Sequence, residues 1–444
     1  MTGNDHQGCA PRDVSHSDVN RADVNYLGVD IGTSGLRLAA LDAAGDCLWL
    51  EKASWPAPAA NADGHEQAPA DWWAVFDGLM CQLGDQGRLA SIGAIAFDGT
   101  SGTVLTVDED GRPEGPALMY DDPKGGEQTD ALRRLDLDPD AQLAGLARWR
   151  YLAEVRGQGG RAISQADWFV LRLTGRHVSD SNNALKWGFD AVAERWPAAL
   201  QRRFGEQLPE VRRPGSAVAP VSTELARRWG LPTETIVASG TTDSMAALWA
   251  SGATEQGDGV TSLGSTLALK LISDRPVSDA ASGVYSHRFG EHFAVSGASN
   301  TGGRVLAAFF TPEEIAALSE SIDPTAADTL GYWPLAARGE RFPVVAPTMA
   351  PRLTPRPAES TLFLGGMLRG IARIEALGYR RFAALGGTDV QRVLSAGGGA
   401  HNPVFARIRE RTLGVPVTLA AHTEAAVGAA RLAAVAMETK GAGR

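Results

Sequence analysis

Cysteine is scarce in this sequence, and its distribution excludes two classes of protein. The chain of 444 residues has three cysteines, Cys9, Cys47 and Cys81, and none of them forms a C-x-x-C pattern. An odd and widely spaced set fits neither a disulfide framework nor a thiolate metal site. We therefore expect a protein of a reducing compartment, the cytoplasm.

Long apolar runs and an excess of positive charge are also missing. No uninterrupted apolar run approaches the ~20 residues of a membrane-spanning helix, and residues 1–24 lack the apolar stretch of a secretory signal. The 42 Lys and Arg are outnumbered by 52 Asp and Glu, giving a net charge of −10, which argues against a surface that neutralises nucleic-acid phosphates. We expect no membrane or nucleic-acid partner, and a mobile polar tail over residues 1–24.

What is present is the composition of a folded protein with more than one domain. Hydrophobic residues make up 44% of the chain and charged residues 21%, which are values typical of soluble globular proteins. At ~100–200 residues per domain the length suffices for two or three domains.

Apolar strands in the first half end in glycine-rich turns. Residues 26–31 form a predicted strand that enters the turn Gly32-Thr-Ser-Gly and returns over residues 36–41 as a hairpin. Residues 91–97 form a second predicted strand, which ends in Asp98-Gly-Thr-Ser. We expect these two strand-and-turn units to lie side by side.

The same pattern recurs in the second half. A predicted strand over residues 259–263 enters Gly264-Ser-Thr, and residues 267–272 form the returning strand. The sequence therefore predicts two α/β lobes, residues 25–250 and 251–444, with a ligand cleft between them.

Five further segments are predicted to be helical from their apolar spacing and helix-start signals. They are residues 69–83, residues 131–175, a segment that starts at residue 304, residues 363–377 and residues 424–437.

Three glycine-rich motifs resemble those of one family. They are Asp30-Ile-Gly-Thr-Ser-Gly-Leu-Arg, Ser262-Leu-Gly-Ser-Thr and Ser395-Ala-Gly-Gly-Gly-Ala-His-Asn, and their order and spacing from Tyr26 to Met437 resemble the FGGY carbohydrate kinases of the actin-like ATPase superfamily. The resemblance implies an α/β fold of two ribonuclease H-like lobes, with mixed sheets flanked by helices, that close over ATP and a sugar. It also implies that the first two motifs bind phosphate and the third binds adenosine.

The residue types in these motifs suit a phosphate-transfer site. Glycine lets backbone N–H groups approach phosphate oxygens, and neighbouring hydroxyl groups add donors. Asp30, at a strand end, is expected to organise Mg²⁺ through water, because Mg²⁺ keeps several of its waters. The predicted ATP-binding residues are Gly32, Thr33, Ser34, Arg37, Gly264, Ser265, Thr266, Gly302, Gly303, Gly397, Gly398, Gly399 and Asn402.

Several of these residues have an alternative structural role. A glycine turn taken alone is an ordinary hairpin turn, Asp30 can be a solvated strand-end carboxylate, and Arg37 can be a cross-strand surface arginine. Asn402 offers its amide either to the adenine base or to the cap of the following helix.

The resemblance assigns the catalytic base to Asp243, at the end of Gly240-Thr-Thr-Asp. A carboxylate suits this role because it needs only to orient the acceptor hydroxyl and take its proton late in the transfer. The alternative is an N-cap for the helix that starts at Ser244. The two roles can coexist.

The sugar-binding W-x-D-x-R stretch of the family is matched only in part, by Tyr120-Asp-Asp-Pro-Lys124. Asp122 is retained, whereas Tyr120 replaces the tryptophan and Lys124 replaces the arginine. Recognition of a polyol needs paired donors and acceptors, because an unpaired buried polar group is costly. The predicted substrate-binding residues are Asp98, Gly99, Thr100, Tyr120, Asp122 and Lys124, and Trp187, Phe189 and Tyr120 are either an apolar wall for the sugar or core residues.

The segments at Asp98-Gly-Thr-Ser and Ser179-Asp-Ser-Asn-Asn resemble a D-ribulose kinase branch whose members are often labelled xylulose kinases. The predicted function is therefore transfer of phosphate from ATP, with Mg²⁺, to the terminal hydroxyl of a ketopentose, D-ribulose first. The alternatives are a D-xylulose kinase and a non-catalytic nucleotide-binding switch. A monomer or a homodimer is expected.

Overall fold

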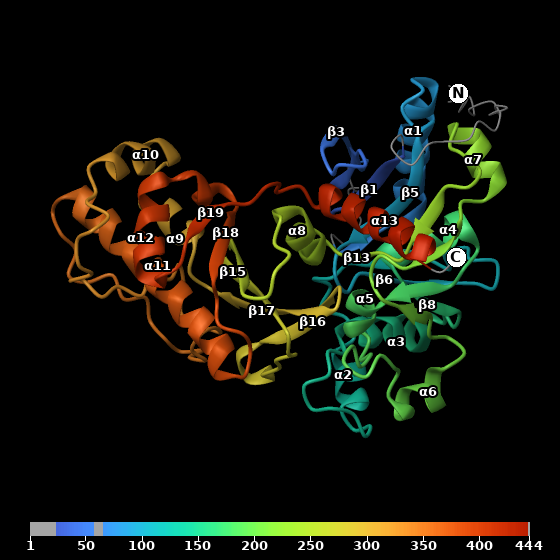
Figure 1. The fold of residues 1–444 in the computed structure, drawn as a ribbon. Coiled ribbons are helices and arrows are strands. Elements are labelled where there is room, and N and C mark those ends of the chain that lie inside the picture. Colours follow the sequence, from blue (N-terminus) through green and yellow to red (C-terminus); the bar gives the residue numbers. More distant parts are fainter. Residues whose placement is uncertain (1–23, 57–64, 443–444) are drawn as a thin grey trace, which may run out of the picture. The chain divides into compact units, whose positions relative to one another are not determined.

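The computed structural model describes residues 24–56 and 65–442, which form two compact units. Unit 1 runs to Trp249 and includes the last segment of the chain from Glu424, and unit 2 is Ala250–Thr423 (Figure 1). The mobile tail predicted for residues 1–24 lies, except for its last residue, outside the described residues.

Unit 1 is built on a seven-stranded mixed sheet. Its strands are β1 (Asn25–Ile31), β2 (Gly35–Leu41), β3 (Cys47–Ser54), β5 (Ile92–Gly99), β11 (Ala217–Pro220), β12 (Ile236–Ala238) and β13 (Thr241–Thr242). The order is β11-β12-β5-β1-β2-β3, and β13 pairs with β5. β1 and β2 form the predicted antiparallel hairpin, and β5 runs parallel to β1 with Asp98 opposite Asp30.

Unit 2 repeats this topology in a six-stranded sheet of order β16-β17-β15-β14-β18-β19. Its strands are β14 (Asp258–Leu263), β15 (Leu267–Ser273), β16 (Tyr285–Phe289), β17 (His292–Ser299), β18 (Arg392–Ala396) and β19 (Val417–Leu419). In each unit a series of antiparallel strands, three in unit 1 and four in unit 2, leads into parallel strands on the other side of the first strand. In unit 1 the edge strand β11 is again antiparallel to its neighbour β12. The predicted fold class is confirmed.

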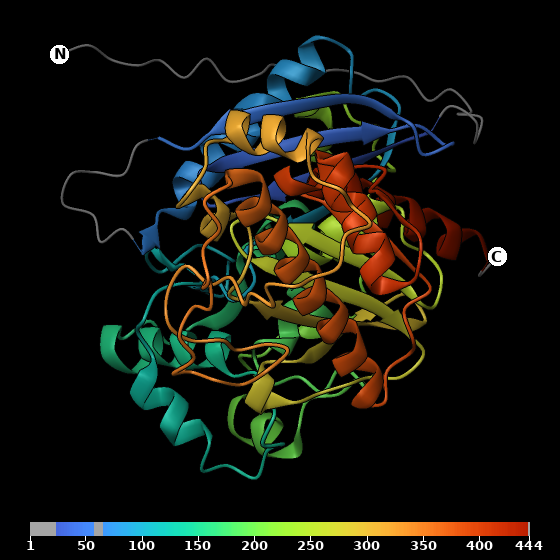
Figure 2. The same cartoon turned by 90° about the vertical axis from the view of Figure 1, so that its left-hand side faces the viewer.

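Helices cover these sheets (Figures 1 and 2). Four predicted helices are present with shifted ends: α1 (Pro69–Asp85), α9 (Gly303–Ala307), α11 (Ser360–Ala384) and α13 (Ala425–Ala442). Six further helices are α5 (Ser181–Leu185), α6 (Ala198–Phe204), α7 (Thr223–Trp229), α8 (Asp243–Ser251), α10 (Pro312–Glu320) and α12 (Pro403–Leu413), and there are 3-10 turns η2 (Ala280–Ser282) and η3 (Gly398–His401). None of the helices in residues 24–56 and 65–442 has the length and apolar character to cross a bilayer.

The continuous helical stretch predicted over residues 131–175 is wrong in its middle. The structure has α2 (Gly126–Leu132), α3 (Ala144–Arg156), strand β8 (Arg161–Ser164) and α4 (Gln165–Thr174) there. β8 pairs with β6 (Val104–Val107) in a sheet that also holds β4 (Glu66–Gln67) and β7 (Ala117–Leu118). A strand of four residues has too little periodicity to be recognised, and its pairing partner decides its conformation. A two-stranded sheet of β9 (Val178–Asp180) and β10 (Glu210–Arg212) follows.

The last helix, α13, belongs to unit 1, whereas the sequence predicts it in the second lobe, residues 251–444. The predicted boundary after residue 250 is next to the observed one after Trp249, but α13 groups with unit 1 and packs on β1 and β5. The approach is so close that a Cβ atom added to Gly28 would lie 1.9 Å from the backbone oxygen of Ala426. Glycine at position 28 therefore lets the end of the chain cover the first strand.

Candidate functional site

Three carboxyl groups of unit 1 come together at the ends of its parallel strands. Asp30 ends β1 opposite Asp98 on β5, and Thr241 of β13 pairs with Asp98, which brings Asp243 at the start of α8 to the same edge. Asp30 is 5% exposed and Asp98 is fully buried, whereas Asp243 is only partly buried. The carboxyl group that the sequence predicts as a base is thus the most accessible of the three.

Asp243 also takes part in the start of its helix. The backbone N–H of Ser244 donates to Asp243 Oδ1 at 2.6 Å. The helix-start alternative raised by the sequence is therefore compatible with an accessible carboxylate.

Asp98 lies in an unusual environment for a carboxyl group. Both of its oxygens are buried, no N–H or hydroxyl group of the described residues donates to them, and the carboxyl group of Asp30 lies close by. Burial, followed by the negative charges of Asp30 and Asp243, raises the pKa of Asp98 well above its usual value. Asp98 is therefore not placed as a solvent-facing sugar contact in this structure.

The glycine turn after β1 is a closed hairpin turn with exposed hydroxyl groups. The N–H of Gly32 donates to the carbonyl of Gly35 at 2.9 Å. Thr33 and Ser34 are exposed, and the side chain of Gln67 donates to the Thr33 carbonyl at 2.8 Å. This geometry leaves both hydroxyl groups accessible to a ligand.

Arg37, which the sequence assigns to phosphate binding, lies beside carboxylates. Its Nη1 donates to Asp30 Oδ2 at 2.9 Å, and its Nε lies 3.3 Å from Glu424 Oε2. Lys52 also pairs with Glu424, at 3.2 Å. The Arg37 side chain is 38% exposed, so a phosphate could reach it in competition with these partners.

The residues around Asp30 suit a magnesium ion in one respect. Carboxylate oxygens are the ligands Mg²⁺ prefers, and the buried oxygens of Asp98 lack donors. Within the described part of the chain no group of three or more His, Cys, Asp and Glu side chains has the arrangement of a metal site.

Two predicted substrate residues in the segment after β7, Asp122 and Lys124, are hydrogen-bonded to each other. The backbone N–H of Lys124 donates to Asp122 Oδ1 at 2.8 Å, and its Nζ donates to Asp122 Oδ2 at 3.0 Å. Lys124 Nζ also donates to Glu66 Oε1 at 3.0 Å, and Arg156 pairs with Glu66. The pattern of the sequence did not reveal Glu66 or Arg156, because both lie far from Lys124 along the chain.

A chain of hydrogen bonds runs beside Gly99. Tyr120 N–H donates to Thr103 Oγ1 at 3.0 Å, the hydroxyls of Thr103 and Thr100 are 2.6 Å apart, and Thr100 Oγ1 donates to Gln165 Oε1 at 2.8 Å. The N–H of Thr100 also donates to Gln165 Oε1, at 3.1 Å. Thr103, which the sequence analysis missed, links the predicted residues Thr100 and Tyr120, and Gln165, which it also missed, anchors Thr100.

The three candidate aromatic residues separate into two kinds. Trp187 and Phe189 are 3% and 5% exposed and belong to hydrophobic clusters of unit 1. Tyr120 is 47% exposed. Trp187 and Phe189 therefore act as core residues, and only Tyr120 is accessible to a ligand.

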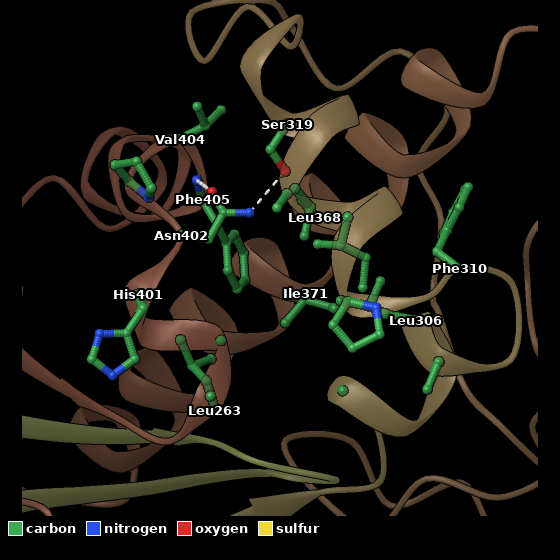
Figure 3. Close-up of a pocket in the computed structure, with 18 of the residues that line it drawn as sticks. Leu263, Leu306, Phe310, Ser319, Leu368, Ile371, His401, Asn402, Val404 and Phe405 are labelled. Carbon is green, nitrogen blue, oxygen red and sulfur yellow. Dashed lines mark hydrogen bonds between the residues drawn. The ribbon is translucent and has the colours of Figure 1, made fainter.

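Unit 2 contains a pocket with a volume of about 580 Å³ (Figure 3). Gly302, Gly303, Gly398, Gly399 and Asn402, all predicted to bind nucleotide, line it. Most of the remaining wall is apolar, formed by Leu263, Leu306, Phe310, Ile315, Leu368, Ile371, Val404 and Phe405. A wall of this kind suits a flat aromatic base.

Asn402 uses both ends of its amide within the protein. Its Oδ1 accepts the N–H of Phe405 at 3.0 Å as the cap of α12, and its Nδ2 donates to Ser319 Oγ at 2.8 Å (Figure 3). Of the two roles that the sequence left open for Asn402, the structure has the helix cap.

The three glycine turns of unit 2 contact one another. The N–H of Gly303 donates to the carbonyl of Gly264 at 2.8 Å, and that of Arg304 donates to Ser265 at 3.2 Å. Gly397, with φ of +83°, lies where a Cβ atom would be 2.8 Å from the Leu263 carbonyl oxygen. The predicted site residues therefore form two groups, one in each unit.

Comparisons with known proteins give the family. Residues 25–153 match the N-terminal domain of the FGGY family of carbohydrate kinases, and residues 259–437 match its C-terminal domain. The second match includes most of α13, which packs on unit 1.

Xylulose kinases are among the similar proteins. The chain is 24% identical to a xylulose kinase of Escherichia coli over 276 residues, 59% of this chain and 57% of the relative. It is 27% identical to a xylulose kinase of Streptomyces coelicolor over 274 residues, 57% of this chain and 55% of the relative. The chain therefore spans little more than half the length of these curated relatives.

A solved structure of a xylulose kinase from Rhodospirillum rubrum has the same fold. It superposes with a TM-score of 0.79 at 24% identity, covering 93% of this chain and 89% of the other. This similarity extends over both units.

Two buried carboxyl groups, Asp167 on α4 and Asp180 at the end of β9, interact with each other in unit 1. Asp167 Oδ2 accepts the hydroxyls of Ser164 and Ser179, each at 2.6 Å. Burial, with the charge of Asp180 as the second cause, raises the pKa of Asp167 to about 8. Asp180, whose pKa burial raises to about 6, caps α5 by accepting the N–H groups of Asn182 and Asn183.

The raised pKa of Asp167 predicts a pH-dependent stability. The folded chain binds the proton of Asp167 more tightly than the unfolded chain does. The protonated side chain therefore makes its full contribution to the free energy of unfolding below pH ~4, and this contribution is lost as the pH rises to about 8. The substitution Asp167→Asn removes this pH-dependent loss. The free energy of unfolding of the variant, compared with that of the wild type, should therefore rise with pH by at most about 1.4 kcal/mol per pH unit.

Urea unfolding of both proteins at pH 5 and pH 8 measures this difference. The exposed Asp136 provides the control, because Asp136→Asn should give the same difference at both pH values. A constant difference for Asp167→Asn as well would contradict the prediction.

Proposed function

Because the chain belongs to the FGGY family of carbohydrate kinases, we propose that it transfers the γ-phosphate of ATP to the terminal hydroxyl of a ketopentose, converting D-ribulose into D-ribulose 5-phosphate. The observation that carries the proposal is the strand-end cluster of unit 1, in which Asp243 is accessible while Asp30 and Asp98 are buried. A sugar kinase needs one accessible carboxylate to activate the acceptor hydroxyl. A nucleotide switch has no such requirement.

Asp243 is the proposed base. Its carboxylate, oriented by the Ser244 N–H, would accept a hydrogen bond from the terminal hydroxyl of the ketose. It would take the proton as the oxygen attacks phosphorus and the bond to the ADP oxygen breaks. Phosphoryl transfer needs mainly this alignment and the neutralisation of phosphate charge.

Arg37 and the turn at Thr33 and Ser34 are the proposed phosphate contacts of unit 1. A guanidinium suits this role because its planar fork binds two phosphate oxygens at once. Arg37 would exchange part of its pairing with Asp30 and Glu424 for the transferred phosphate. Asp30 would then be available to hold Mg²⁺ through water, and the bound ion would neutralise charge on the phosphates.

The pocket of unit 2 is the proposed site for adenosine. Its apolar wall suits the base, and its backbone glycines allow close approach of the ribose and phosphates. Gly264 and Ser265 continue this surface by accepting hydrogen bonds from Gly303 and Arg304, and the backbone of Thr266 lies against Gly302. The proposal keeps the nucleotide role that the sequence predicts for the glycines of unit 2.

The charges beside Asp122 support an uncharged substrate. Lys124 is paired with both Asp122 and Glu66, and Arg156 is paired with Glu66. Arg148 also interacts electrostatically with Asp122 and Asp121, so three cations face three carboxylates and this segment offers no excess positive charge to a sugar acid. A ketopentose has no charge to compensate and needs only hydroxyl partners.

D-xylulose is the second candidate substrate. The names of the relatives favour it, whereas D-ribulose is favoured by the resemblance of Asp98-Gly-Thr-Ser to the D-ribulose kinase branch. The two sugars differ only in the configuration at one carbon, so a direct comparison of rates decides between them.

The substitution Asp243→Asn tests the base. The amide keeps the size of the side chain but does not accept the proton, so we expect kcat to fall by about 10²–10⁴-fold while ATP binding stays within about twofold. ADP formation is measured with D-ribulose, D-xylulose, L-ribulose, ribitol and glycerol.

Asp46→Asn, at an exposed turn residue of unit 1, is the control and should retain full turnover. Sugar phosphorylation by Asp243→Asn at the wild-type rate would refute the assignment of the base. Wild-type protein that binds ATP but responds to no sugar would favour the nucleotide switch.

Glu66→Gln tests the charge balance of the sugar segment. With Glu66 neutral, Arg156 loses the carboxylate with which it pairs and Lys124 keeps only that of Asp122, so the site gains positive charge. We expect the inhibition constant of D-ribonate, measured in competition with the ketose, to fall about fivefold or more. The exposed Glu127 gives the control Glu127→Gln, and an equal change in both variants would contradict the charge argument.

Two neighbouring alanines of α10 test the nucleotide pocket. Ala316 lines the pocket and Ala317 does not, and both are exposed. We expect Ala316→Trp to fill the pocket and raise the Kd for ATP about tenfold, which is about 1.4 kcal/mol, while Ala317→Trp leaves it unchanged. Calorimetric titration with ATP measures both, and equal affinities would place adenosine elsewhere.

A further inference from the structure

Helix α3 contacts three separate segments of unit 1, and two of them carry candidate substrate residues. Its Arg148 side chain reaches the segments after β5 and after β7, at Gly102 and Tyr120. The N–H of Gly145, one turn earlier, donates to the carbonyl of Lys186 at 2.8 Å, just after α5. One helix thus holds the candidate sugar segments of unit 1 together.

Arg148 makes most of these contacts through backbone carbonyl groups. Its Nε donates to the Asp122 carbonyl at 2.9 Å, its Nη2 to the Tyr120 carbonyl at 2.5 Å and its Nη1 to the Gly102 carbonyl at 3.2 Å. The donors of a guanidinium lie in one plane at fixed spacing. The three carbonyls are therefore fixed relative to one another.

Two further contacts join the same segments independently of Arg148. A Cβ atom added to Gly125 would lie 2.9 Å from the backbone of Ala147, so the segment after Lys124 rests directly on α3. The N–H of Tyr120 donates to Thr103 Oγ1 at 3.0 Å. The backbone of this region is consequently built as a unit.

We propose that Arg148 is a positioning residue that fixes the segment of Tyr120 and Asp122 against the segment after β5, and that it thereby sets the affinity for the ketose. The inference rests on the proposed function of these segments. Arg148 acts through their backbone and touches no reacting atom. Small displacements of binding groups weaken substrate binding strongly, because a polyol needs several aligned partners.

A purely structural role predicts a different result from a positioning role. Loss of packing alone would lower the melting temperature and leave the kinetic constants of the folded enzyme unchanged. Loss of positioning raises the KM for the ketose, whereas the KM for ATP stays constant, because the contacts of Arg148 lie on the candidate sugar segments.

The test compares full-length Arg148→Met, Arg148→Lys and Arg150→Met in steady-state kinetics with D-ribulose and D-xylulose. Arg150 lies on the same helix and pairs with Glu154, so its variant controls for the loss of an arginine from α3. We expect the KM for the ketose to rise about tenfold or more in Arg148→Met and about threefold or more in Arg148→Lys, whose ammonium lacks the planar fork. The KM for ATP should change less than twofold in all three variants.

A KM for the ketose within twofold of wild type in the Arg148 variants would overturn the inference, as would an equal rise in Arg150→Met. If Arg148→Met fails to fold, Arg148→Lys decides by the same criterion. Wild-type enzyme that forms ADP with a ketose establishes the proposed function independently of these variants. If no ketose stimulates the wild type, the proposed function fails and this inference fails with it.

Discussion

The parallel pairing of β1 with β5 is the constraint on which the site of unit 1 depends. Parallel strands end at the same edge of a sheet, and the register sets Asp98 directly opposite Asp30. β13 extends the same register at Thr241, which brings Asp243 to that edge. Backbone hydrogen bonds alone therefore gather three carboxyl groups contributed by distant parts of the sequence.

Three carboxyl groups at one sheet edge repel one another when they are ionised, which destabilises the fold. Carboxylates without donors are unfavourable in a buried setting, and Asp98 has no donor among the described residues. Arg37 offsets part of the charge through Asp30. Such a cluster is typical of a site whose charge balance is completed by a ligand rather than by the protein.

The elements that sequence analysis predicted well are those with local signals. The hairpins at Gly32 and Gly264 combine continuous apolar strands with glycine turns. Four of the predicted nucleotide glycines, Gly302, Gly303, Gly398 and Gly399, line one pocket of unit 2, and their role stays a prediction. The assignment of Asp243 depends on a family motif, and its catalytic role stays a prediction. Strand β8 was missed because four residues carry no readable periodicity.

The residues that sequence analysis missed act across long separations. Arg148 lies 26 residues from Asp122, Glu66 lies 58 from Lys124, and Gln165 lies 65 from Thr100. Nothing in their neighbours along the chain marks them, because their partners are defined only by tertiary packing. Trp187 and Phe189 show the converse, since aromatic residues in a functional segment proved to belong to the core.

The position of helix α13 in the sequence affects the order in which the two units can fold. Unit 1 starts with the first strand and is completed by the last helix, so unit 2 is in effect an insertion between α8 and α13. During synthesis the face of β1 and β5 that α13 covers stays open until residues 425–442 have been made, whereas all of unit 2 is made before them. Unit 2 can therefore fold while unit 1 still lacks the helix that covers its first strand.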